Sequence, residues 1–262
     1  MESFSEEELR AGRETKRILR SLRSSEGDLL PLSDREIMLC TMVAKLRPEK
    51  AADKYRRWLE ALKPFGVGSF AELFARLDSE EEWSALAKQL SVFAPCGTDK
   101  LHRSLMWIRG RPIPLTEELA TVRASCVFHL AAHADFTTLR NGVTLVLDTA
   151  SNDMKLRVGN ELKFQQLWQS IPLRPQRFYI LGAGPVKRLL INAVIQVVSY
   201  VAGSDKIISR IRFASINDLL ADVDADALPE HVGGKAGGFK DSVAHLQWVR
   251  ERFLGFPAVP PL

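Results

Sequence analysis

Apolar residues recur at helical spacing through residues 1–95, which predicts an all-helical region. The clearest helix lies in residues 48–62, and its apolar face consists of Ala51, Tyr55, Trp58, Leu59 and Leu62. Two other helices are expected to begin with capping boxes, in which a serine precedes a glutamate by three positions. These pairs are Ser5 with Glu8 and Ser33 with Glu36.

Beyond Pro95, short apolar runs typical of buried strands alternate with helical stretches. Predicted strands lie in residues 102–110, 143–149, 177–181 and 210–215, and predicted helices in residues 115–136, 160–171 and 189–202. This alternation favours a largely parallel sheet with helices packed beside it. We therefore expect an α/β protein with a helical subdomain in residues 1–95, an α/β domain in residues 96–238, and a C-terminal helix followed by a loose Pro-rich tail in residues 239–262.

Composition and charge narrow the class of protein. Hydrophobic residues make up 46% of the chain and charged residues 26%, as in ordinary globular proteins. The three cysteines are far apart, which favours neither a disulfide framework nor a zinc site. The longest apolar run, residues 189–202, is shorter than the roughly 20 residues that span a bilayer. The chain opens with acidic and polar residues, so no signal sequence is expected and a cytoplasmic location is favoured.

The net charge of +4 permits docking to an anionic surface. The aromatic residues are not interleaved with the basic ones as a single-strand-binding face requires, so no nucleic-acid partner is expected.

Motifs for catalysis are absent from the sequence. No G-x-S-x-G nucleophile elbow and no Walker loop occur, although Asp148 ends a predicted strand, where ligands bind in open α/β sheets. His129 and His133 have the spacing of two metal ligands on one helical face, but Leu130 replaces the glutamate of H-E-x-x-H. We expect an ordinary histidine pair, with a polar patch beside a ligand pocket and a metal site as alternatives. No enzyme activity, cofactor or metal is therefore expected.

A series of segments runs through residues 170–234: SIPLRPQRFYIL, the apolar stretch LLINAVIQVVSYVA, the basic turn SDKIISR, the strand RIRFAS and the closing DALPEHVGG. Upstream of them lie KLRPEKAADKYRRWLEAL, GTDKLHRSLMWIRG and RNGVTLVLDTAS. In this order the segments resemble the CRAL-TRIO lipid-binding family, which includes tocopherol, retinaldehyde and phosphatidylinositol transfer proteins. The resemblance implies a helical subdomain followed by an α/β domain with a mostly parallel sheet and a gate helix over an apolar cavity.

The resemblance further implies a hydrophobic lipid ligand that is transferred between membranes or presented at them. Periodicity alone also allows the apolar stretch to be a buried helix in a solid core. As a gate, it would use Leu190, Val194, Val197 and Val201. The cavity walls are expected to include Phe128, Leu145, Leu147, Phe164 and Trp168.

Basic residues flank the expected gate helix and suit an anionic membrane surface, where the protein would dock transiently. Solvated surface charge is the alternative. The expected docking residues are Lys187, Arg188, Lys206 and Arg210, with Lys45 as an approximate match to a further basic position of the family.

Two departures from the family pattern affect the expected ligand. Leu173 stands where phosphatidylinositol-binding members have a glutamate, and a leucine cannot accept a hydrogen bond from an inositol hydroxyl. Phosphatidylinositol is therefore not expected as buried cargo. Residues 182–185, GAGP, replace the usual Asn-x-Pro. The missing glutamate and the altered gate region, which lacks the family's usual Lys-Pro-Phe, favour an alternative function as a protein-interaction scaffold associated with small-GTPase or phosphoinositide signalling.

Overall fold

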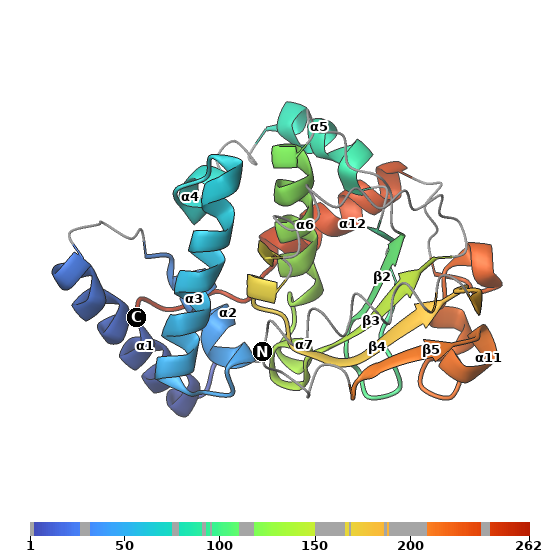
Figure 1. Cartoon of the computed structure of the whole chain (residues 1–262), viewed down its shortest axis with the longest axis horizontal. Helices are drawn as coiled ribbons and strands as arrows, with labels where there is room; N and C mark the ends of the chain where they lie inside the picture. Colours follow the sequence, from blue (N-terminus) through green and yellow to red (C-terminus); the bar gives the residue numbers. More distant parts are fainter. Residues whose placement is uncertain are drawn as a thin grey trace.

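The computed structural model describes residues 3–26, 32–74, 79–90, 93–94, 96–109, 118–149, 166–167, 169–185, 188, 209–236 and 242–262. A helical part and a sheet part lie side by side, and helix α6 (Glu118–Ala132) stands between them (Figure 1). Helices are combined with a sheet whose strands are mostly parallel, so the predicted mixed α/β class is confirmed.

The helical part consists of α1 (Glu6–Glu26), α2 (Asp34–Val43), α3 (Pro48–Leu62), the 3-10 turn η1 (Lys63–Phe65), α4 (Phe70–Leu73) and α5 (Glu80–Leu90). The predicted apolar face of α3 is buried along its whole length. The capping box at Ser5 forms, because its hydroxyl accepts from the Glu8 N–H at 3.2 Å and its own N–H donates to the Glu8 carboxylate at 2.7 Å. The predicted box at Ser33 is wrong, since the Ser33 N–H donates to the Tyr55 hydroxyl instead and its side chain caps nothing.

The sheet contains β1 (Phe93–Ala94), β2 (Leu105–Arg109), β3 (Val143–Asp148), β4 (Pro175–Leu181) and β5 (Ile211–Ala214), side by side in chain order. Strands β2 to β5 are parallel, and only β1 is antiparallel to its neighbour. The connections from β2 to β3, β3 to β4 and β4 to β5 are therefore crossovers.

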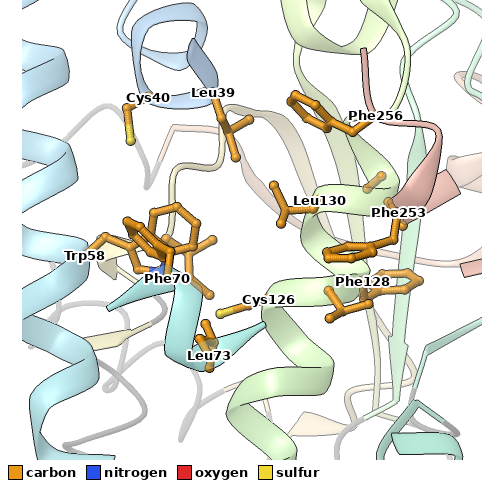
Figure 2. Packing of buried hydrophobic residues seen from close by; sticks show 14 of the residues in the cluster. Leu39, Cys40, Trp58, Phe70, Leu73, Cys126, Phe128, Leu130, Phe253 and Phe256 are labelled. Carbon is orange, nitrogen blue, oxygen red and sulfur yellow. The ribbon is translucent and has the colours of Figure 1, made fainter. Parts of the chain in front are cut away.

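The two faces of the sheet are covered by different elements. On one face, residues of α2, α3, α4, α6 and α12 (Ser242–Leu254) form the main core, which Figure 2 shows around Trp58, Phe70 and Phe253. This cluster includes sheet residues, so it joins the helical part to the sheet. On the other face, Trp107 and Tyr179 pack in a second cluster under α11 (Ile216–Leu219) and the 3-10 turns η3 (Ala225–Ala227) and η4 (Glu230–Val232).

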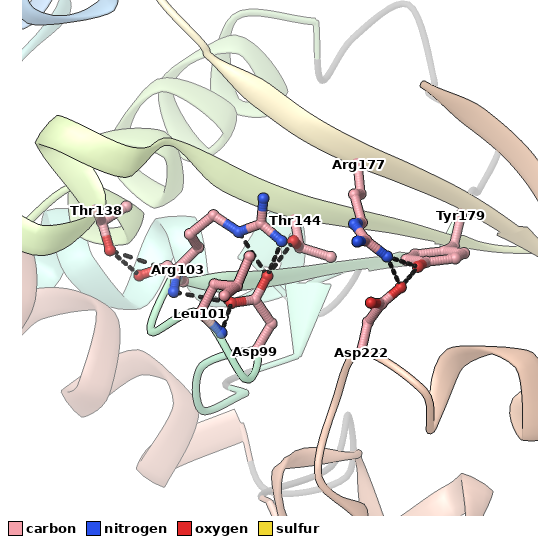
Figure 3. Close-up of polar contacts among 9 residues, drawn as sticks. Asp99, Leu101, Arg103, Thr138, Thr144, Arg177, Tyr179 and Asp222 are labelled. Carbon is pink, nitrogen blue, oxygen red and sulfur yellow. Dashed lines mark hydrogen bonds and ion pairs between the residues drawn. The ribbon is translucent and has the colours of Figure 1, made fainter. Parts of the chain in front are cut away.

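Buried polar contacts fix the amino ends of the strands (Figure 3). The Asp99 carboxylate accepts from the backbone N–H of Leu101 at 2.9 Å and of Arg103 at 3.0 Å, which folds a turn where the sequence pattern predicts the start of a strand. The same carboxylate accepts from the Thr144 hydroxyl at 2.6 Å and so joins this turn to β3. Strand β2 therefore begins only at Leu105.

The helix expected in residues 115–136 is interrupted. Helix α6 ends at Ala132, and a separate helix, α7 (Phe136–Asn141), follows it. Asp135 is the N-cap of α7, because its carboxylate accepts from the Thr138 N–H at 2.6 Å. A capping aspartate has extended backbone dihedrals, which cannot continue a helix.

The prediction of a loose C-terminal tail is wrong, because the tail packs against the rest of the molecule. Phe256 is buried, and the Arg35 guanidinium lies over its ring at 4.7 Å from the ring centroid. Val259 and Leu262 pack against the main core. The tail follows the helical part as far as α1 (Figure 1).

Candidate ligand-binding face of the sheet

Apolar side chains form two rows across the α6 face of the sheet. Because side chains alternate between the faces of a strand, every second residue of β2 to β5 points to this side. The strand register aligns Met106, Leu145, Phe178 and Ile211 in one row. It aligns Ile108, Leu147, Ile180 and Phe213 in the other.

These rows are only partly covered. Met106, Leu145 and Ile180 are buried. The remaining five are half-buried: Ile108, Leu147, Phe178, Ile211 and Phe213. Both residues that β5 contributes, Ile211 and Phe213, belong to this second group. Of these five, Ile108 and Phe178 pack against the main core. The partial exposure that remains is suited to contact with an apolar partner.

The carboxyl ends of the strands carry a second, polar feature. Asp148, at the end of β3, is buried, and its carboxylate lies 2.9 Å from Nε2 of His231 in η4. The His231 ring meets the Trp107 ring edge to face, with centroids 5.8 Å apart. Next to Asp148, the Thr149 hydroxyl donates to the Leu181 carbonyl at 2.6 Å. The sequence indicates Asp148 as a strand end but not its partner, which comes from the closing segment DALPEHVGG.

Two arginines lie at the amino ends of β4 and β5. The Arg210 guanidinium donates to the Pro175 carbonyl at 2.7 Å, and that of Arg174 donates to the Arg140 carbonyl at 2.6 Å. Burial lowers the pKa of Arg174, and the positive charge of Arg210 lowers it further. Neither guanidinium forms an ion pair with any acidic side chain that the structure describes. The pair is therefore a concentration of positive charge without an acidic counterpart among these residues.

The other predicted docking residues that the structure describes are not gathered at this pair. Arg188 is exposed, donates to the Ala183 carbonyl at 2.9 Å and lies 5.5 Å from the centroid of the Phe213 ring. Lys45 is exposed in the turn between α2 and α3, in the helical part of the molecule. Lys187 and Lys206 lie outside the described residues.

The predicted cavity residues have different positions. Phe128 is fully buried in the main core, with its ring centroid 6.1 Å from that of Trp248. Leu145 and Leu147 belong to the two apolar rows, and only Leu147 is half-exposed. The predicted gate residues and the remaining wall residues lie outside the described part of the chain: Leu190, Val194, Val197, Val201, Phe164 and Trp168.

The two histidines of α6 are packed in the interior. His129 Nε2 donates to the Pro172 carbonyl at 2.9 Å, and His133 Nδ1 donates to the His129 carbonyl at 2.9 Å. Burial lowers the pKa of both rings, and that of His133 falls to about 4. Among the described residues, no group of three or more His, Cys, Asp or Glu side chains is arranged to hold a metal ion. The geometry agrees with the expected histidine pair.

A hollow of about 490 Å³ lies beside α1, and five of its eight lining residues are charged. Its walls are formed by Glu7, Arg10, Ala11, Arg13, Glu14, Arg17, Leu46 and Pro48. Arg13 pairs with Glu6, and Arg17 pairs with Glu14 at 2.6 Å, so much of its charge is compensated. This lining does not match an apolar ligand.

Within the described ranges, no helix combines the length and the apolar character that crossing a membrane requires. Comparison of the sequence with known protein families finds no family model that matches, and comparison with curated proteins finds no match either.

Proposed function

We propose that the chain binds a lipid-type ligand against the α6 face of the sheet and transfers or presents it at anionic membranes. The observation that carries this proposal is the pair of apolar rows, of which five residues stay half-buried. Each methylene group of a lipid that leaves water for an apolar surface gains roughly 0.8 kcal/mol. An acyl or isoprenoid chain lying along these rows would gain this free energy and cover the sheet residues as well.

The proposed gate follows from the connection between β4 and β5. Crossovers between parallel strands are right-handed in nearly all cases. The connection from β2 to β3 contains α6, and the strands follow one another in the same direction across the sheet. In this proposal the apolar stretch 189–202, which belongs to the connection from β4 to β5 and lies outside the described residues, serves as the gate on the α6 face. A lid in this position would cover the half-buried rows.

Docking would use the positive charges near β4 and β5. Each basic residue close to an anionic lipid surface contributes about 1 kcal/mol. Arg174 and Arg210, at the amino ends of these strands, have no acidic counterpart in the described part of the chain. Arg188 is exposed beyond the carboxyl end of β4 and is not part of this pair. Membrane contact at this side would bring the ligand-binding face close to the source of the lipid.

Native mass spectrometry of the protein purified from cells tests the proposal. A bound lipid of defined mass is expected on the wild-type chain. Leu147→Glu introduces a charge into the apolar rows and is expected to reduce the lipid-bound fraction at least tenfold. Leu101→Glu is the matched control, because Leu101 is 59% exposed in a turn at the opposite end of β2, and it is expected to keep the lipid. A wild-type protein that is folded but carries no lipid, and takes none up from vesicles, would contradict the proposal.

A further inference from the structure

Helix α1 has few fully buried apolar side chains. Within residues 6–22, Ala11 and Leu19 are its only fully buried apolar side chains, while Leu9 and Ile18 are partly buried against the main core. Its beginning is held by α7, because the Phe4 and Phe136 rings lie 4.9 Å apart and the Glu8 carboxylate pairs with Arg140 at 2.8 Å. Elements with few buried apolar contacts open at low free-energy cost. Helix α1 packs against α2 and α3, and its middle receives further contacts from elsewhere in the chain.

Those contacts come from the segment that follows α12. Residues 255–262 leave the end of α12, pass α2 and reach α1 (Figure 1). Arg35 of α2 contacts the end of α12 and the first part of this segment. Its guanidinium lies 4.4 Å from the centroid of the Phe253 ring and 4.7 Å from that of Phe256, and it donates to the Phe253 carbonyl.

Leu262 is held at the middle of α1 by a notch and a charged pair. Gly12 forms the notch, since a Cβ at this position would lie 3.1 Å from the Leu262 side chain and 2.4 Å from the Met38 sulfur. Lys16 donates to the Leu262 carbonyl at 2.9 Å, and the Leu262 N–H donates to the Asp34 carboxylate at 3.3 Å. Lys16 and Asp34 also pair with each other at 2.7 Å.

We propose that residues 255–262 form a latch, and that the second half of α1 swings away from α2 when this latch is released. Glycine is the least favourable residue after proline in a helix interior, so Gly12 is best explained by the close approach of Leu262 and Met38. The latch holds both backbone polar groups of Leu262 as well as its side chain. Opening would break the contact at 3.1 Å between the Thr15 and Thr41 hydroxyls and uncover Met38. This device is independent of the proposed lipid ligand.

Hydrogen–deuterium exchange of the full chain tests the latch. Leu262→Asp places a charge in the notch and is expected to speed amide exchange in residues 12–22 at least tenfold. Exchange in α3 and α6, and at the α7-anchored beginning of α1, is expected to stay at the wild-type rate. Ala258→Asp is the matched control, because it adds the same charge to an exposed position of the same segment, and it is expected to exchange as the wild type does.

A second variant removes a contact of the latch on the α1 side. Lys16→Met keeps the aliphatic stem but removes the ammonium group that contacts Leu262 and Asp34, and the same local acceleration is expected. Arg10→Met, at an exposed position of the same helix, is its control. Unchanged exchange in residues 12–22 of both latch variants would overturn the proposal. Equal acceleration in all helices would also overturn it, because it would indicate general destabilisation instead of a hinged opening.

Discussion

Gly142 and Gly66 both have positive φ, 85° and 75°, but their ψ angles and their surroundings differ. A Cβ at Gly142 would lie 2.3 Å from the Arg174 carbonyl oxygen, whereas no atom lies within 4 Å of a Cβ at Gly66. The carbonyl belongs to the backbone that leads into β4 and cannot move away without disturbing the sheet.

We therefore expect Gly142→Ala to lower the free energy of unfolding by about 3 kcal/mol, since it adds a backbone clash to a conformation that glycine almost alone adopts. Gly66→Ala should lower the free energy of unfolding by about 1 kcal/mol through backbone strain alone. Urea unfolding monitored by circular dichroism measures both values. Equal losses in the two variants would show that the close approach to Arg174 contributes nothing.

The titration of the Glu36 carboxyl makes the free energy of unfolding depend on pH. Burial raises its pKa to about 7, and the charge of Arg35 opposes this only in part. The unfolded chain releases this proton near its ordinary pKa of 4.5, so the folded state is increasingly disfavoured as the pH rises from 4.5 to about 7. Above that range the full penalty remains.

Glu36→Gln removes the titrating proton and is expected to be more stable than the wild type at pH 8 by about 2–3 kcal/mol. At pH 4.5 the two proteins should differ little, because both side chains are then neutral. Denaturant titrations of both proteins at each pH measure the difference. His129 and His133 are present in both proteins, so their effects on stability cancel in this difference. The pH dependence of the difference therefore reports on Glu36 alone. A difference that is the same at both pH values would contradict the assignment.

At the scale of secondary structure, local patterns predict some features well and others not at all. The apolar face of α3 and the strands around Leu145 and Phe178 follow from periodicity and apolar runs. The break between α6 and α7 does not, because Asp135 acts as an N-cap only when its carboxylate turns toward Thr138. The apolar runs of buried parallel strands also do not reveal which residues share a face. The two apolar rows became apparent only from the strand register.

The amino ends of β4 and β5 give a prediction about membrane docking. Arg174→Ala and Arg210→Ala are each expected to weaken binding to vesicles that contain anionic lipid about fivefold, which corresponds to about 1 kcal/mol for one basic residue. Binding should also decrease as salt is added. Co-sedimentation with vesicles measures the affinity. Arg17→Ala is the control, because Arg17 is exposed on α1 and pairs with Glu14. If this control weakens binding as much as the other two, the docking surface does not lie at these strand ends.

At the scale of the whole molecule, the class of fold could be predicted and the long-range contacts could not. Helical spacing before Pro95 and alternation after it are sufficient for a mixed α/β protein. The core that joins the helical part to the sheet, the pairing of Asp148 with His231 and the contact of Lys16 with Leu262 connect residues far apart in the sequence. Such contacts depend on packing in three dimensions, and no local pattern of apolar and polar residues encodes them.

The order of the strands has a consequence for the shape of a ligand. Nucleotide-binding sheets have a topological switch point, where neighbouring crossovers leave toward opposite faces and open a crevice at the strand tips. Strands β2 to β5 are adjacent in chain order, and in a sheet of this order right-handed crossovers would all share one face. A ligand on that face would lie flat across the strands instead of entering a crevice at their ends. Such an arrangement favours long, flexible hydrocarbon chains over compact nucleotides.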